Sequence, residues 1–247
     1  MSRLQQQLKQ VADARRVELL PYIFEQTQGL VQQGPFEGML ILPISSWGDG
    51  DSASKLLGVY EDELHDVVNN VIDSGPDHII NVGCAEGYYT IGFAHVLPKS
   101  TGVAIDMDMS AVNVCNKNLK ANSIENVQAY HKEGNHTWLQ SQCDNAKKPF
   151  LLMDCEGAEL DLLDLKDIPA LCKTRILVEC HDCVRPGITQ TLQERFKDTH
   201  TITLIQQKYK DPYQFEFLKN LSDCDKWALV HEGRPSAMTW LYMVPLK

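Results

Sequence analysis

Short apolar segments alternate with longer amphipathic stretches over most of the chain. From residue 78 onward, segments rich in β-branched residues recur about every 25 residues with helix-compatible sequence between them, a pattern that predicts repeated β-α-β units. The segments read HIINV, TGVAI, NVQAY, FLLMD and RILVEC. Residues 79–82 and 176–178 are almost continuously apolar, which is typical of parallel strands covered by helices on both faces. We therefore expect a buried central sheet.

The C-terminal part departs from this repeat. THTITLIQ and MTWLYMVP are separated by a long segment that contains Asp and Pro. The pattern predicts two closing strands, compatible with an antiparallel pair, and a short helix around residues 215–221.

The N-terminal part contains no comparable strand repeat. Its sequence indicates helices around residues 4–28 and 61–74, joined by a loop that contains Gly-Pro and Trp-Gly-Asp-Gly. We interpret residues 1–75 as a helical lid rather than a second domain, and residues 76–247 as the α/β part of the same structural unit.

Composition and charge narrow the class of protein. The chain has 247 residues, of which 43% are hydrophobic, enough for a substantial core. The polar N-terminus does not resemble a secretory signal, and no stretch approaches about 20 uninterrupted apolar residues, so we expect a cytoplasmic protein without a membrane partner. The net charge of −10 and the absence of a Lys/Arg cluster argue against a nucleic-acid partner.

Eight cysteines are present, but disulfide frameworks belong mainly to short secreted chains. Several of these cysteines lie within apolar strand-like segments, so we expect buried free thiols. Cys180 and Cys183 form a C-x-x-C pair without a second pair at zinc-ribbon spacing, which makes structural zinc the weaker interpretation.

A glycine-rich turn joins the first predicted strand to its helix. HIINV leads directly into Gly83 and Gly87, and YYTIGFAHVL follows, so the turn allows a ligand to approach the backbone. Asp106 ends the next strand about 20 residues later, where a carboxylate accepts hydrogen bonds from ribose hydroxyls. Ala85, Met107 and Asn135 are also expected at this cofactor site. The structural alternative is that the glycines serve only strand–helix packing.

Glu86 bears on the choice of cofactor. A dinucleotide places its phosphates at the positive N-terminus of the helix, and the carboxylate of Glu86 would repel them. S-adenosylmethionine carries no phosphate and has a sulfonium and an ammonium group, so the same carboxylate is tolerated. The turn therefore favours S-adenosylmethionine over NAD.

The sequence resembles the FkbM-like class I methyltransferases through NVGCAEGYYTIGFA, AIDMD, MDCEGAELDLL and ILVECHD, and further through LLGVYEDELHDVV and EGRPSAMTWLYMVP. The resemblance covers about residues 58–245. It implies a Rossmann-like fold with a seven-stranded, mostly parallel sheet, an antiparallel last strand and helices on both faces. It also implies a methyl donor and often an oxygen nucleophile on a natural product or sugar. Tyr60 and Glu61 match the family's Y-E pattern, which places them beside the cofactor or acceptor.

The acceptor chemistry is expected where the fourth and fifth strands end. Asp154 follows the fourth strand, and His181 and Asp182 follow the fifth; carboxyl ends of parallel strands face one crevice. Methyl transfer depends mainly on alignment of acceptor and donor, but a hydroxyl must also lose a proton. An imidazole with a pKa near ~6.5 suits this role, so His181 is the candidate base, with Asp154 and Asp182 beside it. The alternative is a structural histidine that caps the strand or binds a backbone carbonyl.

A divalent metal is the second, less favoured arrangement, with Asp154, His181 and Asp182 as ligands. The layout is similar to catechol O-methyltransferases, which have an Asp after the fourth strand and Asp-Asn after the fifth. Histidine departs from that pattern and favours manganese, iron or zinc over magnesium. Trp47, Lys55 and Arg234 are further polar candidates, each with a structural alternative.

These observations favour O-methylation of a small hydroxylated metabolite, natural product or sugar. The partner is then a small-molecule acceptor, and a homodimer is left open. The alternatives are N-methylation of an amine, carboxyl methylation of a peptide, a non-catalytic cofactor-binding protein and an NAD-dependent oxidoreductase. A free amine is already nucleophilic, so N-methylation would depend less on His181.

Overall fold

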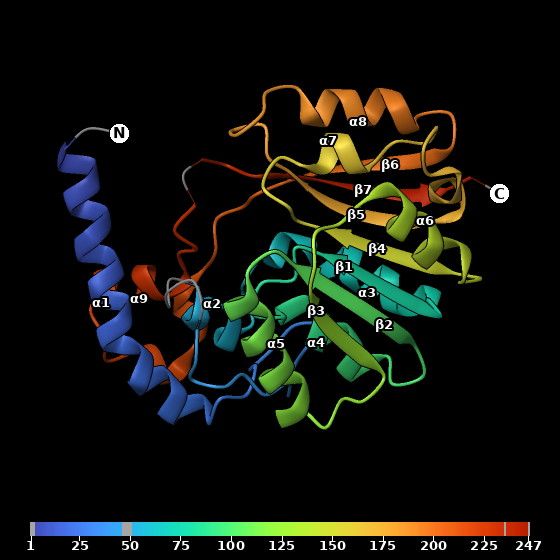
Figure 1. Cartoon of the computed structure of the whole chain (residues 1–247). Coiled ribbons are helices and arrows are strands. Elements are labelled where there is room, and N and C mark those ends of the chain that lie inside the picture. Colours follow the sequence, from blue (N-terminus) through green and yellow to red (C-terminus); the bar gives the residue numbers. More distant parts are fainter. Residues whose placement is uncertain (1–2, 46–50, 235, 247) are drawn as a thin grey trace.

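The computed structural model describes residues 3–45, 51–234 and 236–246. Within these ranges, seven strands form one sheet in the order β3-β2-β1-β4-β5-β7-β6 (Figure 1). The first five strands pair in parallel, whereas β7 lies antiparallel between β5 and β6. The strands are β1 His78–Val82, β2 Thr101–Asp106, β3 Val127–His131, β4 Pro149–Met153, β5 Arg175–Cys180, β6 His200–Gln206 and β7 Thr239–Pro245. The predicted Rossmann-like sheet and its reversed last strand are confirmed.

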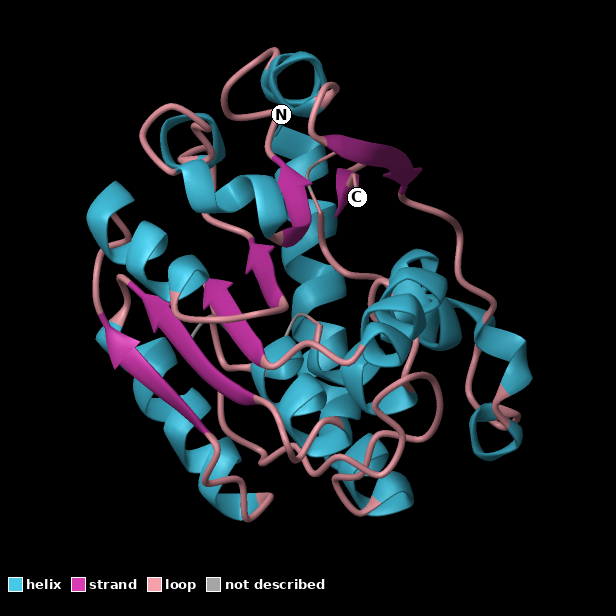
Figure 2. Cartoon of the chain, turned by 90° about the vertical axis from the view of Figure 1, so that its right-hand side faces the viewer, coloured by secondary structure: helices cyan, strands magenta, loops and turns pink. Residues whose placement is uncertain are grey.

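Helices cover both faces of the sheet (Figure 2). One face packs against α3 His65–Ser74, α4 Tyr88–Val96 and α5 Met109–Ala121. The other packs against α6 His136–Asp144, α7 Glu159–Leu162, the 3-10 turn η2 Pro169–Lys173 and α8 Ile188–Phe196. Successive strand side chains point to opposite faces, so Leu151 joins the second layer and Leu152 the first. This double burial explains the continuously apolar strand sequences.

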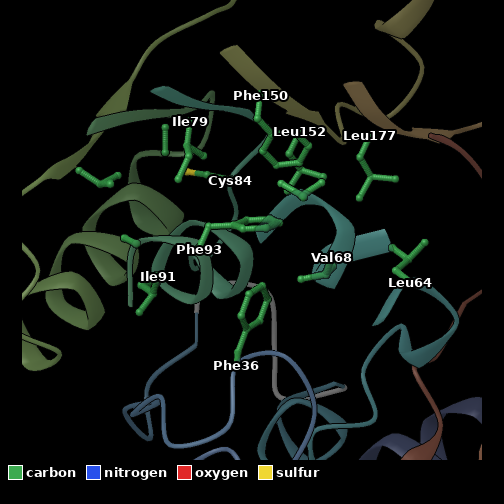
Figure 3. Close-up of a cluster of buried hydrophobic side chains, with 14 of the residues drawn as sticks. Phe36, Leu64, Val68, Ile79, Cys84, Ile91, Phe93, Phe150, Leu152 and Leu177 are labelled. Atoms are coloured by element: carbon green, nitrogen blue, oxygen red, sulfur yellow. The ribbon is translucent and has the colours of Figure 1, made fainter. Parts of the chain in front are cut away.

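Aromatic side chains connect the N-terminal segment to the first layer (Figure 3). Phe93 of α4 packs edge-on against Phe150 of β4, with ring centroids 5.0 Å apart. Phe36, from the loop after the first helix, meets Phe93 at 5.3 Å. A side chain at Gly92 would lie 2.5 Å from the Phe36 ring, so a glycine is needed for this close contact.

A separate helical cluster draws on both ends of the chain. It contains α1 Arg3–Thr27, α2 Ser52–Leu57, the 3-10 turns η3 Pro212–Gln214 and η4 Glu216–Leu218, and α9 Asp223–Val230. Arg15 pairs with Asp225 at 2.7 Å, and the Tyr22 hydroxyl donates to the Phe217 carbonyl oxygen at 2.6 Å. The short helix expected around residues 215–221 is the 3-10 turn η4, and the α-helix begins only at Asp223. The expected helix at 61–74 consists of η1 Asp62–Leu64 followed by α3.

None of the helices in the described ranges is both long and apolar enough to cross a membrane. All eight cysteines fall within those ranges as free thiols; Cys84, Cys115, Cys143 and Cys180 are buried.

The strand order brings the functional loops to one edge of the sheet. The loops after β1, β2, β4 and β5 all leave from the carboxyl edge of the parallel strands. Because β7 runs in the opposite direction, its first residue, Thr239, pairs with Cys180 at this same edge. The segment that precedes β7, including Arg234, therefore joins the loops of strands distant in sequence.

Candidate active site

The turn after β1 requires glycine at two positions. Gly83 has φ +81°, and a Cβ there would overlap the Asp154 carbonyl oxygen of the neighbouring loop. Gly87 has φ +93° and is the N-cap residue before α4; a Cβ there would lie 2.5 Å from the Cys115 sulfur. Ala85 also adopts a left-handed conformation, with φ 44°. The backbone thus passes unusually close to the β4 loop, which defines one wall of the site.

Asp106 connects this turn to β2. Its two carboxylate oxygens accept hydrogen bonds from the backbone N–H groups of Ala85, at 2.9 Å, and Asp108, at 2.8 Å. A carboxylate has further acceptor positions, so ribose hydroxyls can bind without displacing these contacts. Met107 is exposed beside it. The Asn135 side chain accepts from the Trp138 N–H as the N-cap of α6.

Glu86 has partners that the sequence did not indicate. Its carboxylate accepts a hydrogen bond from Ser45 at 2.7 Å and lies 3.5 Å from the ammonium group of Lys55. Lys55 is buried and pairs with Asp51 at 2.7 Å. Although burial opposes it, the Asp51 and Glu86 carboxylates raise the pKa of Lys55. A buried cation therefore offsets the charge of Glu86, and the electrostatic argument against a dinucleotide is weaker than the sequence suggested.

Two adjoining pockets open at the carboxyl edge of the sheet. The first follows the glycine-rich turn and is lined by Gly83, Ala85 and Glu86, among others. The second has a volume of about 240 Å³ and lies in front of His181 and Arg234. The pockets share three residues: Tyr60, Asp154 and Glu179. Trp47, also a candidate from the sequence, lies outside the described residues.

Arg234 connects three carboxylates from different parts of the chain. It bonds to Glu61 and Glu179, and to Glu232 at 2.7 Å. Glu61 also accepts a hydrogen bond from the Tyr89 hydroxyl at 2.5 Å. Burial, followed by the nearby Asp154 and Glu61 carboxylates, raises the pKa of Glu179 to about 10. The bond between Arg234 and Glu232, two residues apart, therefore belongs to a larger network that forms the wall of both pockets.

His181 lies at the base of the second pocket and is 4% exposed. Its Nδ1 atom is 2.8 Å from Oε1 of Glu159, which is fully buried and also accepts from the Gly157 N–H at 3.2 Å. Its Nε2 atom is 3.5 Å from both Asp154 Oδ1 and Glu156 Oε2. Burial opposes protonation, but the bond to Glu159 and the charge of Asp154 raise the pKa of His181 to about 9.

Asp154 faces both pockets. Desolvation, followed by the Glu61 carboxylate, raises the pKa of Asp154 to about 7. Its ionisation is therefore balanced near neutral pH, which suits a group that exchanges protons.

The structure does not bring Asp182 into this group. Its carboxylate accepts hydrogen bonds from the Gly187 N–H at 2.9 Å and from the Thr189 hydroxyl, so it holds the start of α8. Glu156 lies beside Asp154 and His181 instead. Sequence reasoning missed Glu156 and Glu159 as site residues; both belong to the DCEGAE segment after β4, but spacing alone did not show that this segment turns back toward β5.

One known family matches part of this chain. Residues 45–146 match the family model for the methyltransferase small domain. The match covers about two fifths of the chain and supports a methyltransferase. The matched part contains the glycine-rich turn and Asp106, and it ends before β4. The residues of the second pocket from β4, β5 and the segment before β7 lie outside it.

Solved structures show the same fold at low sequence identity. A proposed O-methyltransferase from Klebsiella pneumoniae is 15% identical; the alignment covers 75% of this chain and 81% of that chain, with a TM-score of 0.51. Cofactor-bound Rv0187 from MTB is 12% identical, with 77% and 86% covered and a TM-score of 0.50. A search of curated proteins gave no match to this chain.

Proposed function

We propose that this methyltransferase transfers the methyl group of S-adenosylmethionine to an oxygen of a small hydroxylated metabolite, natural product or sugar. The observation that carries the proposal is the pair of adjoining pockets, one against the glycine-rich turn and one in front of His181. A donor in the first and an acceptor in the second would meet at their shared wall, as an in-line transfer requires.

The first pocket suits the charges of S-adenosylmethionine. Asp106, which is bonded to Ala85 of this pocket, would bind the ribose hydroxyls; Met107 and Asn135, which lie outside the pocket lining, would meet the remainder of the nucleoside. Glu61 and Asp154 offer carboxylates to the sulfonium and ammonium groups, and no phosphate has to be accommodated near Glu86. The resemblance to FkbM-like methyltransferases supports the same cofactor and an oxygen acceptor.

In the second pocket, we assign removal of the acceptor proton to the pair of side chains Asp154 and His181. With a pKa of about 9, His181 is mostly protonated at neutral pH, so less of it is available to accept a proton than the sequence suggested. Asp154, with a pKa of about 7, is better matched to accept a proton. His181, fixed by Glu159, would orient Asp154 and the acceptor.

An amine acceptor is the second candidate. Among the described residues that line the second pocket, acidic side chains outnumber basic ones. Such a pocket attracts a cationic ammonium group more strongly than a neutral hydroxyl.

Calorimetry with S-adenosylhomocysteine and with NADH tests the cofactor. We expect about micromolar affinity for S-adenosylhomocysteine, within the range common for enzyme ligands, and no heat with NADH. Binding of NADH alone would contradict the proposal. Isotope-labelled S-adenosylmethionine and an extract of small molecules then test the acceptor: label released by mild base indicates a methyl ester, whereas a methyl ether or N-methyl product retains it.

A further inference from the structure

Three side chains from two adjacent loops converge beside the second pocket. Asp154, Glu156 and His181 each offer one ligand atom, and these atoms all lie within 4.8 Å of one another. We propose that Asp154, Glu156 and His181 bind one divalent cation of the Mn²⁺ type. If the proposed function holds, this cation also binds the acceptor oxygen.

The histidine is oriented as a metal ligand. The same Oε1 atom of Glu159 accepts backbone N–H groups and lies 2.8 Å from His181 Nδ1. Nδ1 therefore donates to this carboxylate, and the lone pair of the neutral ring lies on Nε2. A carboxylate behind a histidine is the usual outer-shell arrangement at metal sites, where it fixes the tautomer and the ring. Here the carboxylate is itself fixed by the Gly157 N–H at 3.2 Å and the Cys155 N–H at 3.3 Å.

The distances suit a cation between these atoms. Nε2 lies 3.5 Å from both Asp154 Oδ1 and Glu156 Oε2, which is beyond ordinary hydrogen-bond length. Ligand bonds of about 2.1–2.2 Å would span 3.5 Å with an N–metal–O angle of about 105–113°. That angle is close to the values of tetrahedral and distorted octahedral sites. A small movement of the side chains would therefore complete the site.

The charge and the exposure of the three side chains also support a cation site. Two carboxylates balance a divalent cation, and one imidazole nitrogen with oxygen ligands suits Mn²⁺ better than Mg²⁺, which prefers oxygen alone. The Asp154 and Glu156 side chains are 42% and 79% exposed. Open coordination positions would thus face the pocket, as in metal sites that bind a substrate. Asp154 would use Oδ1, so its second oxygen stays outside the proposed ligand set.

Mn²⁺ titration followed by electron paramagnetic resonance tests the site, because bound Mn²⁺ loses the signal of the free aqueous ion. We expect one Mn²⁺ per chain for the wild type. Glu156→Gln removes the negative charge of an exposed ligand and should weaken binding at least tenfold with the thermal midpoint unchanged. Glu133→Gln makes the same charge change at an exposed position outside the cluster and should bind Mn²⁺ like the wild type.

Three results would overturn the proposal: no binding at millimolar Mn²⁺, unchanged binding in Glu156→Gln, or equal weakening in both variants. Calorimetry with S-adenosylhomocysteine on the same samples separates this proposal from the proposed function. Cofactor binding without Mn²⁺ binding removes the metal site and leaves the methyltransferase assignment. Mn²⁺ binding without cofactor binding keeps the metal site and contradicts the proposed function.

Discussion

Asp106→Ala should weaken binding of S-adenosylhomocysteine by roughly 10- to 150-fold. Hydrogen bonds to a charged acceptor contribute about 1.5–3 kcal/mol, and every 1.4 kcal/mol corresponds to about a tenfold change in affinity. The ribose hydroxyls would lose their carboxylate partner, whereas the rest of the cofactor pocket would remain.

The structure adds a stability effect to this prediction. Asp106 accepts hydrogen bonds from the backbone N–H groups of Ala85 and Asp108, and alanine leaves both donors without this partner. A partly buried donor that loses its acceptor costs about 1–3 kcal/mol. These contacts predict a lower free energy of unfolding together with weaker binding.

Calorimetry and chemical unfolding on the same preparations separate the two effects. Asp108→Ala is the matched control, because Asp108 caps α5 through the Ser110 N–H at 2.7 Å and should cost about 1 kcal/mol of stability with unchanged cofactor affinity. Asp106→Asn keeps one acceptor oxygen and should fall between wild type and Asp106→Ala in affinity. Wild-type affinity in folded Asp106→Ala would refute the assignment of Asp106 to the ribose.

Two further predictions concern stability. Gly83→Ala should lower the free energy of unfolding by at least about 3 kcal/mol, because a Cβ would overlap the Asp154 carbonyl oxygen. Gly38 has a similar φ of +83° but open space around its Cβ, so Gly38→Ala should cost only about 1–2 kcal/mol. Equal losses in the two variants would contradict this reasoning. The pKa of His181 is raised from about 6.5 to about 9. Its protonation therefore stabilises the fold fully below about pH 6.5, and up to about 3 kcal/mol of the free energy of unfolding is lost as the pH rises through about 9. Urea unfolding in the presence of EDTA from pH 6 to 10 should show this loss for the wild type and not for His181→Gln.

The centre of the sheet was predictable because β1, β4 and β5 are buried on both faces. HIINV, FLLMD and RILVEC are apolar without alternation, and that feature alone excludes strands with one solvated face. The helical cluster was less predictable. Helix α1 packs against α9. Arg15 of α1 pairs with Asp225 of α9, which lies 210 residues later in the chain. Local periodicity contains no information on such pairs.

The proposed cofactor half of the site is local in sequence, and for that reason its strand, turn and helix could be predicted. The strand, turn and helix around Gly83 and Gly87 are contiguous, and Asp106 ends the adjacent strand. Glu86 shows the limit of this approach: its partner Lys55 lies 3.5 Å away but belongs to a helix that precedes β1. The charge of a residue is readable from sequence, whereas its compensation depends on tertiary contacts.

The acceptor half is assembled from separate segments. Arg234 connects Glu61, from before α3, with Glu179, from the end of β5, and neither pairing follows from spacing. Asp182 and Glu156 also could not be assigned from spacing. The backbone at Glu156 has φ 54°, and its carboxylate lies 3.5 Å from His181. Asp182 instead holds the start of α8. The family match ends at residue 146, before β4. The matched part therefore contains the proposed cofactor half, and under the proposed function the residues that select the acceptor are to be sought in the loops after β4 and β5 and in the segment before β7.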